Sequence, residues 1–262
     1  MMRATLRAEA RKARYQRTTY GIVLAASALA AVSAVSLIAT TQLPRRQQLP
    51  MALTDASTMH LVVSSTTGGY VFALVLGILV MTTEFRHGTA IATYLAQPDR
   101  RTVMLAKMVV AAALGAILQF LSTALGMIAS GLYVQRYAHA VLPFDAYTRV
   151  MAGSVLVGAV LGIMGVAVGS LLRNQVLAIV VSLLWLQLVE GLLVVFADWI
   201  GRWSIRGAIT SVLDIAVQVR TPQAAIDTSN GLGPWASTLL LLGYAAVLAL
   251  IALVTSLRRD VA

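Results

Sequence analysis

Glu190 is the one acidic residue that lies deep within a long apolar stretch of the sequence. An acidic side chain near the centre of a membrane helix costs about 2.5–3.5 kcal/mol on an insertion scale. It therefore indicates either a functional site or a protonated group that hydrogen-bonds a neighbouring helix. Ser64, Thr66 and Thr67 occupy another apolar stretch, and helical rise places Thr67 at about the depth of Glu190. We expect these four residues to line a path for a polar or cationic group, with helix packing as the alternative.

A polar segment, 84–101, separates two of the apolar stretches and forms a second candidate site. Gly88 permits a turn, Thr89 is suited to cap a helix, and Pro98 ends that helix after about two turns. Leu95 would lie on one face, with Tyr94 beside it. Such a short helix favours docking to a soluble partner, and the alternative is a plain hairpin between two membrane helices. The residues concerned are Glu84, Arg86, Gly88, Thr89, Tyr94, Leu95, Pro98 and Arg101.

The residue types needed for familiar catalytic sites are missing or wrongly spaced. Cysteine is absent, and none of the three histidines belongs to an HExxH zinc motif. Ser154 and Ser170 have no histidine on their own helices to act as a base. The two lysines, Lys12 and Lys107, are not followed by the Ser or Thr of a phosphate-binding Walker A loop. The sequence therefore predicts no enzyme, no metal site and no bound cofactor in this chain.

The composition predicts a helical membrane protein. Hydrophobic residues make up 59% of the chain and charged residues 11%, against about 45–50% and about 25% in soluble domains. The period-2 alternation of barrel strands is missing. Six uncharged stretches are near the roughly 20 residues that cross a bilayer as a helix, and we predict an all-α bundle of six transmembrane helices within residues 20–262. The stretches are 21–41, 61–83, 108–135, 150–172, 175–197 and 235–257.

The basic residues predict the orientation of these spans. With a cytoplasmic N-terminus, 13 of the 20 Lys and Arg residues fall on the cytoplasmic side, so both termini are expected inside. This distribution, without a basic patch interleaved with aromatic residues, argues against nucleic-acid binding. Residues 1–19 carry arginines at helical spacing. They are predicted to form a basic helix along the inner membrane surface, with a solvated tail as the alternative.

Two further segments carry patterned small or apolar residues. The fourth stretch has one glycine face, which predicts close packing against another helix. The segment 198–234 before the last stretch has apolar residues at helical spacing, together with Trp199 and Trp203, and indicates short re-entrant or surface helices. The glycines of the packing face are Gly158, Gly162, Gly165 and Gly169.

The polar segment and the predicted topology together resemble one family. Directly after the second stretch, the pattern is similar to that of ABC-2 type permeases, the membrane subunits of bacterial ABC exporters. The sequence likeness is confined to about residues 80–110, whereas the six-span topology is similar along the whole chain. The residues that carry the pattern are Glu84, Gly88, Thr89, Leu95, Pro98, Arg101 and Lys107.

This resemblance implies a permease in the bacterial plasma membrane that moves a hydrophobic or amphipathic substrate outward. It implies two permease copies and two copies of a separate ATPase subunit, on which ATP and Mg²⁺ would bind. The cytoplasmic segment 84–107 would contain the coupling element, and the segment 198–234 would form an external gate, with a simple interfacial anchor as the alternative. Two other functions stay open: a proton-coupled secondary transporter that uses Glu190, and a non-transporting ABC-like membrane sensor.

Overall fold

The computed structural model describes residues 2–41, 62–63, 65–138, 144–196, 198–213 and 232–258. Nearly all of these residues are helical, and no strand occurs among them. Helices satisfy every backbone hydrogen bond within one segment, as a chain this apolar requires in a bilayer. The predicted all-α fold is therefore confirmed for the described part of the chain.

The helices follow one another with short connections where the structure describes them. By length and composition, five are able to cross a membrane: Arg17–Ser36, Arg100–Arg136, Tyr147–Leu172, Gln175–Val194 and Pro234–Thr255. The full order is α1 (Met2–Tyr15), α2 (Arg17–Thr41), α4 (Tyr70–Arg86), α5 (Ala90–Ala96), α6 (Arg100–Ala138), α7 (Phe144–Leu172), α8 (Gln175–Leu184), the π-helical turn η1 (Trp185–Val189), α9 (Glu190–Phe196), α10 (Asp198–Gly201), α11 (Ile205–Val212) and α12 (Pro234–Arg258).

The second predicted span differs from its expected form, because its long helix begins at Tyr70. Residues 66–69 form a turn. There the Ser65 and Thr66 hydroxyls donate to the backbone oxygens of residues three positions earlier, at 2.7 and 2.6 Å, and two consecutive glycines follow that have low helix propensity. The 17 residues of α4 extend about 26 Å at helical rise, somewhat less than the roughly 30 Å of a hydrocarbon core.

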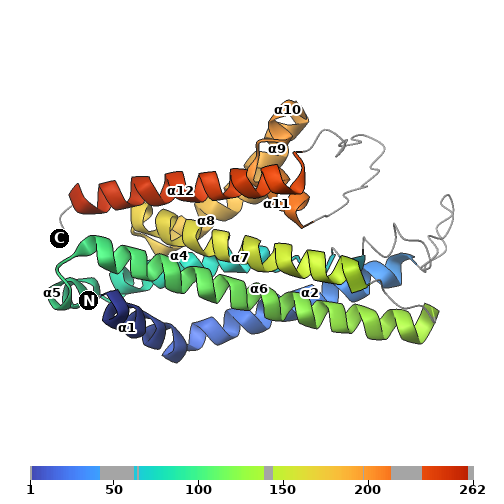
Figure 1. The fold of residues 1–262 in the computed structure, drawn as a ribbon, viewed down its shortest axis with the longest axis horizontal. Coiled ribbons are helices and arrows are strands. Elements are labelled where there is room, and N and C mark those ends of the chain that lie inside the picture. The colour runs from blue at the N-terminus through green and yellow to red at the C-terminus, as the bar shows by residue number, and fades with distance from the viewer. Residues whose placement is uncertain are drawn as a thin grey trace.

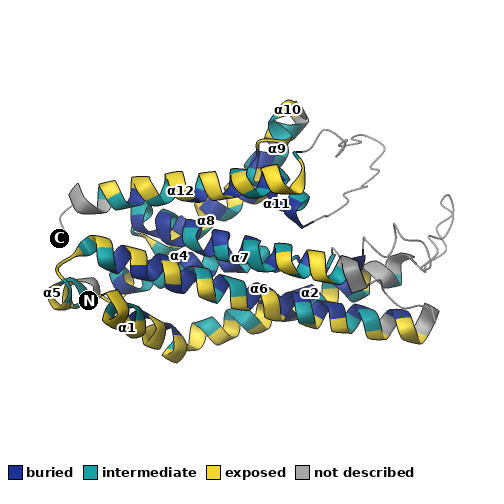
Figure 2. Cartoon of the chain, viewed as in Figure 1, coloured by how far each residue is buried: buried dark blue, intermediate teal, exposed yellow. Residues whose placement is uncertain are grey.

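The long helices form a bundle with α7 at its centre. Helix α7 packs against α4, α6 and α12, and α2 packs against α6. Helix α1, the short helix α5 and the last turns of α12 lie at the same end of the bundle, whereas α8, η1 and α9 lead away from the bundle axis toward α10 (Figure 1). The faces turned toward α7 are largely buried, and the outer face of α12 is exposed (Figure 2).

Glycines on α7 bring its backbone into contact with two neighbouring helices. A Cβ added at Gly158 would lie 2.4 Å from the carbonyl oxygen of Gly115 on α6, and one at Gly165 would lie 2.3 Å from a carbonyl oxygen of α4. Gly162 is equally close to α6, and Gly169 approaches α4 at 3.1 Å. These close approaches are possible only where a side chain is absent, which is the packing logic of small residues in membrane helices.

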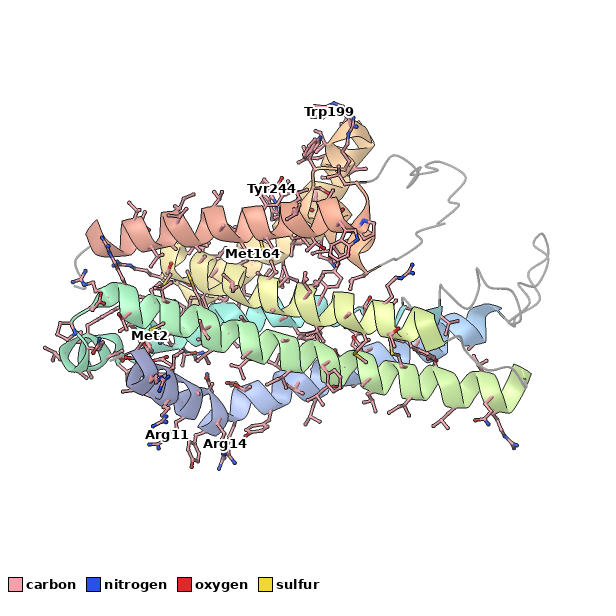
Figure 3. The ribbon with its side chains drawn as sticks, in the orientation of Figure 1. Met2, Arg11, Arg14, Met164, Trp199 and Tyr244 are labelled. Carbon is pink, nitrogen blue, oxygen red and sulfur yellow. The ribbon has the colours of Figure 1, made fainter. Side chains whose placement is uncertain are left out.

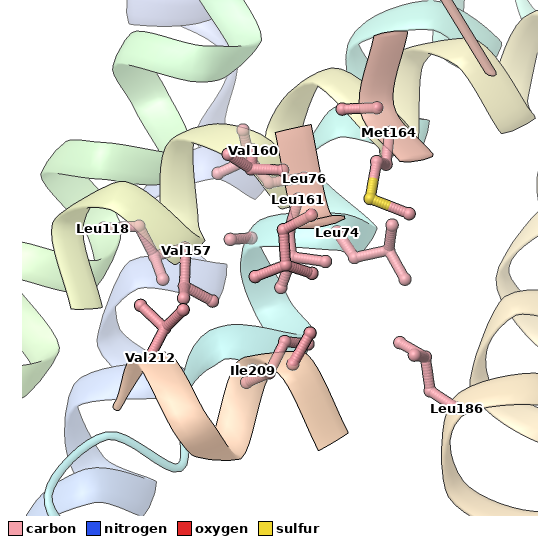
Figure 4. Close-up of a cluster of buried hydrophobic side chains, with 14 of the residues drawn as sticks. Leu74, Leu76, Leu118, Val157, Val160, Leu161, Met164, Leu186, Ile209 and Val212 are labelled. Atoms are coloured by element: carbon pink, nitrogen blue, oxygen red, sulfur yellow. The ribbon is translucent and has the colours of Figure 1, made fainter. Parts of the chain in front are cut away.

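The main hydrophobic core fills the space between α4, α6, α7 and α11. Leu74 and Leu76 of α4 meet Val157 and Leu161 of α7 there, and Ile209 of α11 completes the cluster (Figure 4). Burial of each such side chain contributes about 1.5–3 kcal/mol. Helix α11, within the predicted external segment, is thus part of the packed core. Residues 214–231 of that segment lie outside the described residues.

Candidate functional site

The short helix α5 stands between two backbone features that set its ends. Gly88 has φ +67°, a left-handed conformation that glycine adopts without the cost of a Cβ. Thr89 occupies the N-cap position, but its hydroxyl makes no capping hydrogen bond. At the other end, Gln97 is extended, as the residue before Pro98 should be. The helix therefore spans seven residues, Ala90–Ala96, as the segment 84–101 predicted.

Helix α5 exposes apolar side chains at the end of the bundle. Leu95 is 78% exposed and Ile91 is 56% exposed, one turn apart on the same face. Tyr94 is half-buried beside them, and the guanidinium of Arg100 lies 5.7 Å from the centre of its ring. The predicted site residues Arg86, Pro98 and Arg101 are exposed around this helix. The result is a small apolar face within a basic rim.

Glu84, at the end of α4, belongs to a network of four ionic side chains. Its Oε1 lies 2.7 Å from the Nζ of Lys107 on α6 and 2.8 Å from the Nζ of Lys12 on α1. Glu9 of α1 contacts the same two lysines, with its Oε1 2.7 Å from Lys12 and its Oε2 2.7 Å from Lys107. Each glutamate thus bridges both lysines, and the four charges form a closed, neutral ring.

The ring is mostly withdrawn from solvent. Lys107 is 1% exposed and Glu9 is 4% exposed, whereas the side chain of Lys12 is 49% exposed. A buried charge is tolerable only when it is paired, and removing one partner of a buried pair costs about 3–5 kcal/mol. We therefore expect the ring to fix the positions of α1, α4 and α6 relative to one another.

The titration of the α1 members follows from the same contacts. Burial alone raises the pKa of Glu9, but the two lysines outweigh it, and the net pKa lies below the ordinary value. Burial alone lowers the pKa of Lys12, but its hydrogen bonds to the two glutamates outweigh that effect and raise the pKa above the ordinary value. Both side chains are therefore charged at neutral pH.

The ring also touches α5. The ammonium of Lys12 donates to the Thr93 hydroxyl of α5 at 3.3 Å, and Thr93 in turn donates to the Thr89 backbone oxygen at 3.2 Å. A second link joins α1 to α4, where the Gln16 side-chain amide donates to the hydroxyl of Thr83 at 3.3 Å. These bonds connect α5 to α1 and, through the ionic ring, to the ends of α4 and α6.

Helix α1 is anchored by this network on one face only. Glu9 and Ala13 are buried against the bundle, whereas Arg3, Arg7, Arg11 and Arg14 are exposed; Figure 3 shows Arg11 and Arg14 on the side of α1 away from the bundle. Sequence reasoning missed the roles of Glu9, Lys12 and Lys107. The available signal was an acidic and a basic residue three positions apart, Glu9 and Lys12, in an otherwise arginine-rich helix.

Glu190 lies where the fifth predicted span changes its winding. The α-helical pattern gives way to the π-helical turn η1 at Trp185–Val189, and Glu190 follows it directly. Such π-turns are rare and often mark functional sites. The Glu190 carboxylate is 4% exposed. It accepts hydrogen bonds from the Trp185 indole nitrogen at 3.1 Å and from the backbone nitrogens of Ile205 and Arg206 at 3.3 and 2.7 Å.

Glu190 thus holds the N-terminus of α11 against η1 and α9. Ser204 reinforces this end, because its hydroxyl accepts from the Gly207 backbone nitrogen at 2.8 Å. A carboxylate is stabilised at a helix N-terminus both by unpaired N–H groups and by the helix dipole. Beside it lies a cavity of about 210 Å³ lined by residues of η1, α9, α10, α11 and α12, together with the turn between α10 and α11.

The hydroxyl residues predicted to accompany Glu190 have partners of their own. Thr66 and Thr67 are buried. Thr66 packs closely against Gly126 of α6, and the backbone oxygen of Thr67 accepts from the Gln119 amide at 2.9 Å. Ser64 lies outside the described residues. Glu190 thus accepts its hydrogen bonds from η1 and α11, whereas Thr66 and Thr67 contact α6, the short helical segment before them and the start of α4.

Neither the geometry nor sequence comparison assigns these sites to a known class. Within the described ranges, no group of three or more His, Asp or Glu side chains is arranged to hold a metal ion. The chain matches no protein-family model, and no curated protein is similar to it in sequence.

Proposed function

We propose that this chain is the membrane subunit of an ATP-driven exporter that is coupled to a separate ATPase through α5. In this proposal the chain crosses a bacterial plasma membrane six times, with α4 as the second span and both termini in the cytoplasm. A hydrophobic or amphipathic substrate would pass between two copies of the chain. ATP and Mg²⁺ would be bound by the ATPase alone.

One observation carries the proposal: an exposed apolar helix whose base is anchored by buried charges. Leu95 and Ile91 project from a segment that joins two long apolar helices. An apolar face with a charged rim has the anatomy of a protein interface. Since Thr93 on the same helix contacts the ionic ring, force applied to α5 would reach α1, α4 and α6 rather than being absorbed by a loose loop.

The charges near α5 indicate the kind of surface that would receive it. Arg86 and Arg101 are exposed beside the helix, and Arg100 lies over Tyr94. A complementary partner would present an apolar groove with an acidic rim, because opposite potentials across an interface favour correct association. Movement of that groove during ATP hydrolysis would then tilt α5 and, through the ring, the spans that follow it.

The proposal is tested by placing a charge on the exposed face of α5. Leu95→Asp should abolish association with the ATPase or uncouple it, because a carboxylate without a partner would enter the apolar contact. The matched control is Ala236→Asp, an exposed position at the start of α12. The assays are copurification of the ATPase subunit and substrate-stimulated ATP hydrolysis in proteoliposomes. Normal assembly and stimulation in Leu95→Asp would refute the proposed coupling role.

A further inference from the structure

The cavity beside Glu190 is lined mainly by aromatic and aliphatic side chains. Three large aromatic side chains, Trp185, Trp203 and Tyr244, contribute to it, and they come from η1, the α10–α11 turn and α12. Aliphatic side chains such as Leu193 and Ile200 complete the lining. Figure 3 places Tyr244 on α12 where that helix passes α9. The walls are thus supplied by separate elements that converge on one space.

Glu190 carries the only carboxyl group in this lining, and no basic side chain is among the lining residues. Glu190 accepts three hydrogen bonds, and only one of them, from the backbone nitrogen of Arg206, reaches its Oε2. A carboxylate has about four acceptor sites, so acceptor capacity is left on Oε2. The guanidinium of Arg206 lies beside Gly191 and acts on the charge of Glu190, but this side chain is exposed to solvent and does not line the cavity. The cavity therefore favours a positive charge.

The aromatic side chains favour the same ligand. A cation over the face of Trp or Tyr is stabilised by about 0.5–2 kcal/mol, and cages of such rings recognise organic ammonium groups. The Tyr244 hydroxyl donates to the Trp203 backbone oxygen at 2.7 Å, which ties α12 to the α10–α11 turn. The Trp185 ring is held by its bond to Glu190. Two of the three rings are therefore positioned before any ligand arrives.

The volume limits the size of the ligand. About 210 Å³ exceeds an engineered cavity of about 150 Å³ that holds benzene, but it is below the roughly 300–1,000 Å³ of sites for drug-sized molecules. A trimethylammonium or similar head group fits this volume, and the rest of a larger ligand would extend out of the site, which is open on one side.

We propose that this cavity is a binding site for the ammonium group of an organic cation. Glu190 neutralises the charge, and Trp185, Trp203 and Tyr244 surround the alkyl groups. The ammonium could come from a soluble cation or from the head group of a phospholipid. The proposal goes beyond ATP-driven transport, because binding is a property of this chain alone.

The test compares choline with its neutral isostere, 3,3-dimethylbutan-1-ol, on the full chain in nanodiscs of phosphatidylglycerol. Trp199→Phe combined with Trp235→Phe leaves Trp185 and Trp203 as the fluorophores. Choline should change their emission saturably, and the isostere should bind at least about tenfold more weakly, a factor that equals 1.4 kcal/mol. Equal binding of the two compounds, or no saturable effect of choline, would overturn the proposal.

Substitutions and lipid composition extend the test. Trp203→Leu should weaken choline binding about tenfold in calorimetry, whereas Trp199→Leu, outside the cavity, should leave it unchanged; equal effects would count against the site. If the parent's apparent affinity for choline falls as phosphatidylcholine replaces phosphatidylglycerol, the lipid head group occupies the same site. If the affinity is independent of that lipid, the site takes soluble cations. The isostere comparison needs no variant, so it holds even if Trp203→Leu fails to fold.

Discussion

The two lysines of the ionic ring provide a sharp test of its energetics. Lys12 and Lys107 contact the same two carboxylates at almost the same distances, 2.7–2.8 Å, but only Lys107 is fully buried. Replacing each with methionine keeps most of the side-chain length and removes the charge. The two variants therefore differ mainly in the environment from which the charge is removed.

The expected magnitudes differ several-fold. Lys107→Met leaves two buried carboxylates sharing one half-exposed ammonium, and breaking a buried pair in this way costs about 3–5 kcal/mol of unfolding free energy. Lys12→Met removes a charge that water already screens, and we expect a cost of about 1 kcal/mol or less. Adding Glu9→Gln to Lys107→Met removes the excess negative charge, so the double variant should be more stable than the sum of the single effects by about 1–3 kcal/mol.

The unfolding free energies can be measured by SDS titration in mixed micelles, with helical circular dichroism as the signal. Glu190→Gln serves as a control for loss of a buried charge outside the ring, and it should show no coupling to Lys107→Met. If Lys12→Met costs as much as Lys107→Met, or if Glu9→Gln adds its full cost to Lys107→Met, burial does not govern the ring and the reasoning fails.

Three further predictions use the same unfolding assay. Because its folded pKa is lowered, Glu9 contributes stability above its ordinary pKa of 4.5, and this contribution should disappear as pH falls through the folded pKa. The difference in unfolding free energy between Glu9→Gln and the parent should therefore shrink over that range. A difference that stays constant with pH would contradict the assignment. Gly162→Ala should destabilise the protein by about 1–3 kcal/mol, since its Cβ would lie 2.3 Å from an α6 carbonyl oxygen. The control Gly243→Ala on α12, whose Cβ would meet nothing within 4 Å, should be neutral or stabilising. Equal effects of the two variants would refute close packing at Gly162. Gly88→Ala should cost about 1–2 kcal/mol because it forces a left-handed alanine, and an unchanged stability would show that the turn readjusts freely.

The long helices could be predicted from composition because their signal is local. An uninterrupted apolar run has few alternatives to a helix in a membrane, and α12 begins and ends within about one residue of the predicted stretch 235–257. The segment around α5 was equally readable, since Gly88 and Pro98 act on the backbone next to them. The start of α4 was not, because Thr66 and the glycines after it pack against α2 and α6, which are distant in sequence.

The ionic ring could not be predicted because its members are distant in sequence. Glu9 and Glu84 share the same two lysines only when α1 folds back against α4 and α6, and that arrangement depends on contacts between distant segments. The prediction for Glu190 had a similar limit. Its depth in the span was evident, but its bonds to the start of α11 depend on a turn fifteen residues later, and the π-helical turn before it has no sequence signature.

The central claim, that α5 seats on a separate ATPase, is tested most directly by site-specific crosslinking. The chain has no cysteine, so the thiol introduced by Leu95→Cys is unique and can carry a photoreactive benzophenone group. Trp199→Cys, on the exposed helix α10, is the control. In a complex that hydrolyses ATP in response to substrate, the label at position 95 should crosslink to a polypeptide that contains a Walker A motif, and the label at position 199 should not. An active complex in which position 95 reaches no nucleotide-binding polypeptide would contradict the account.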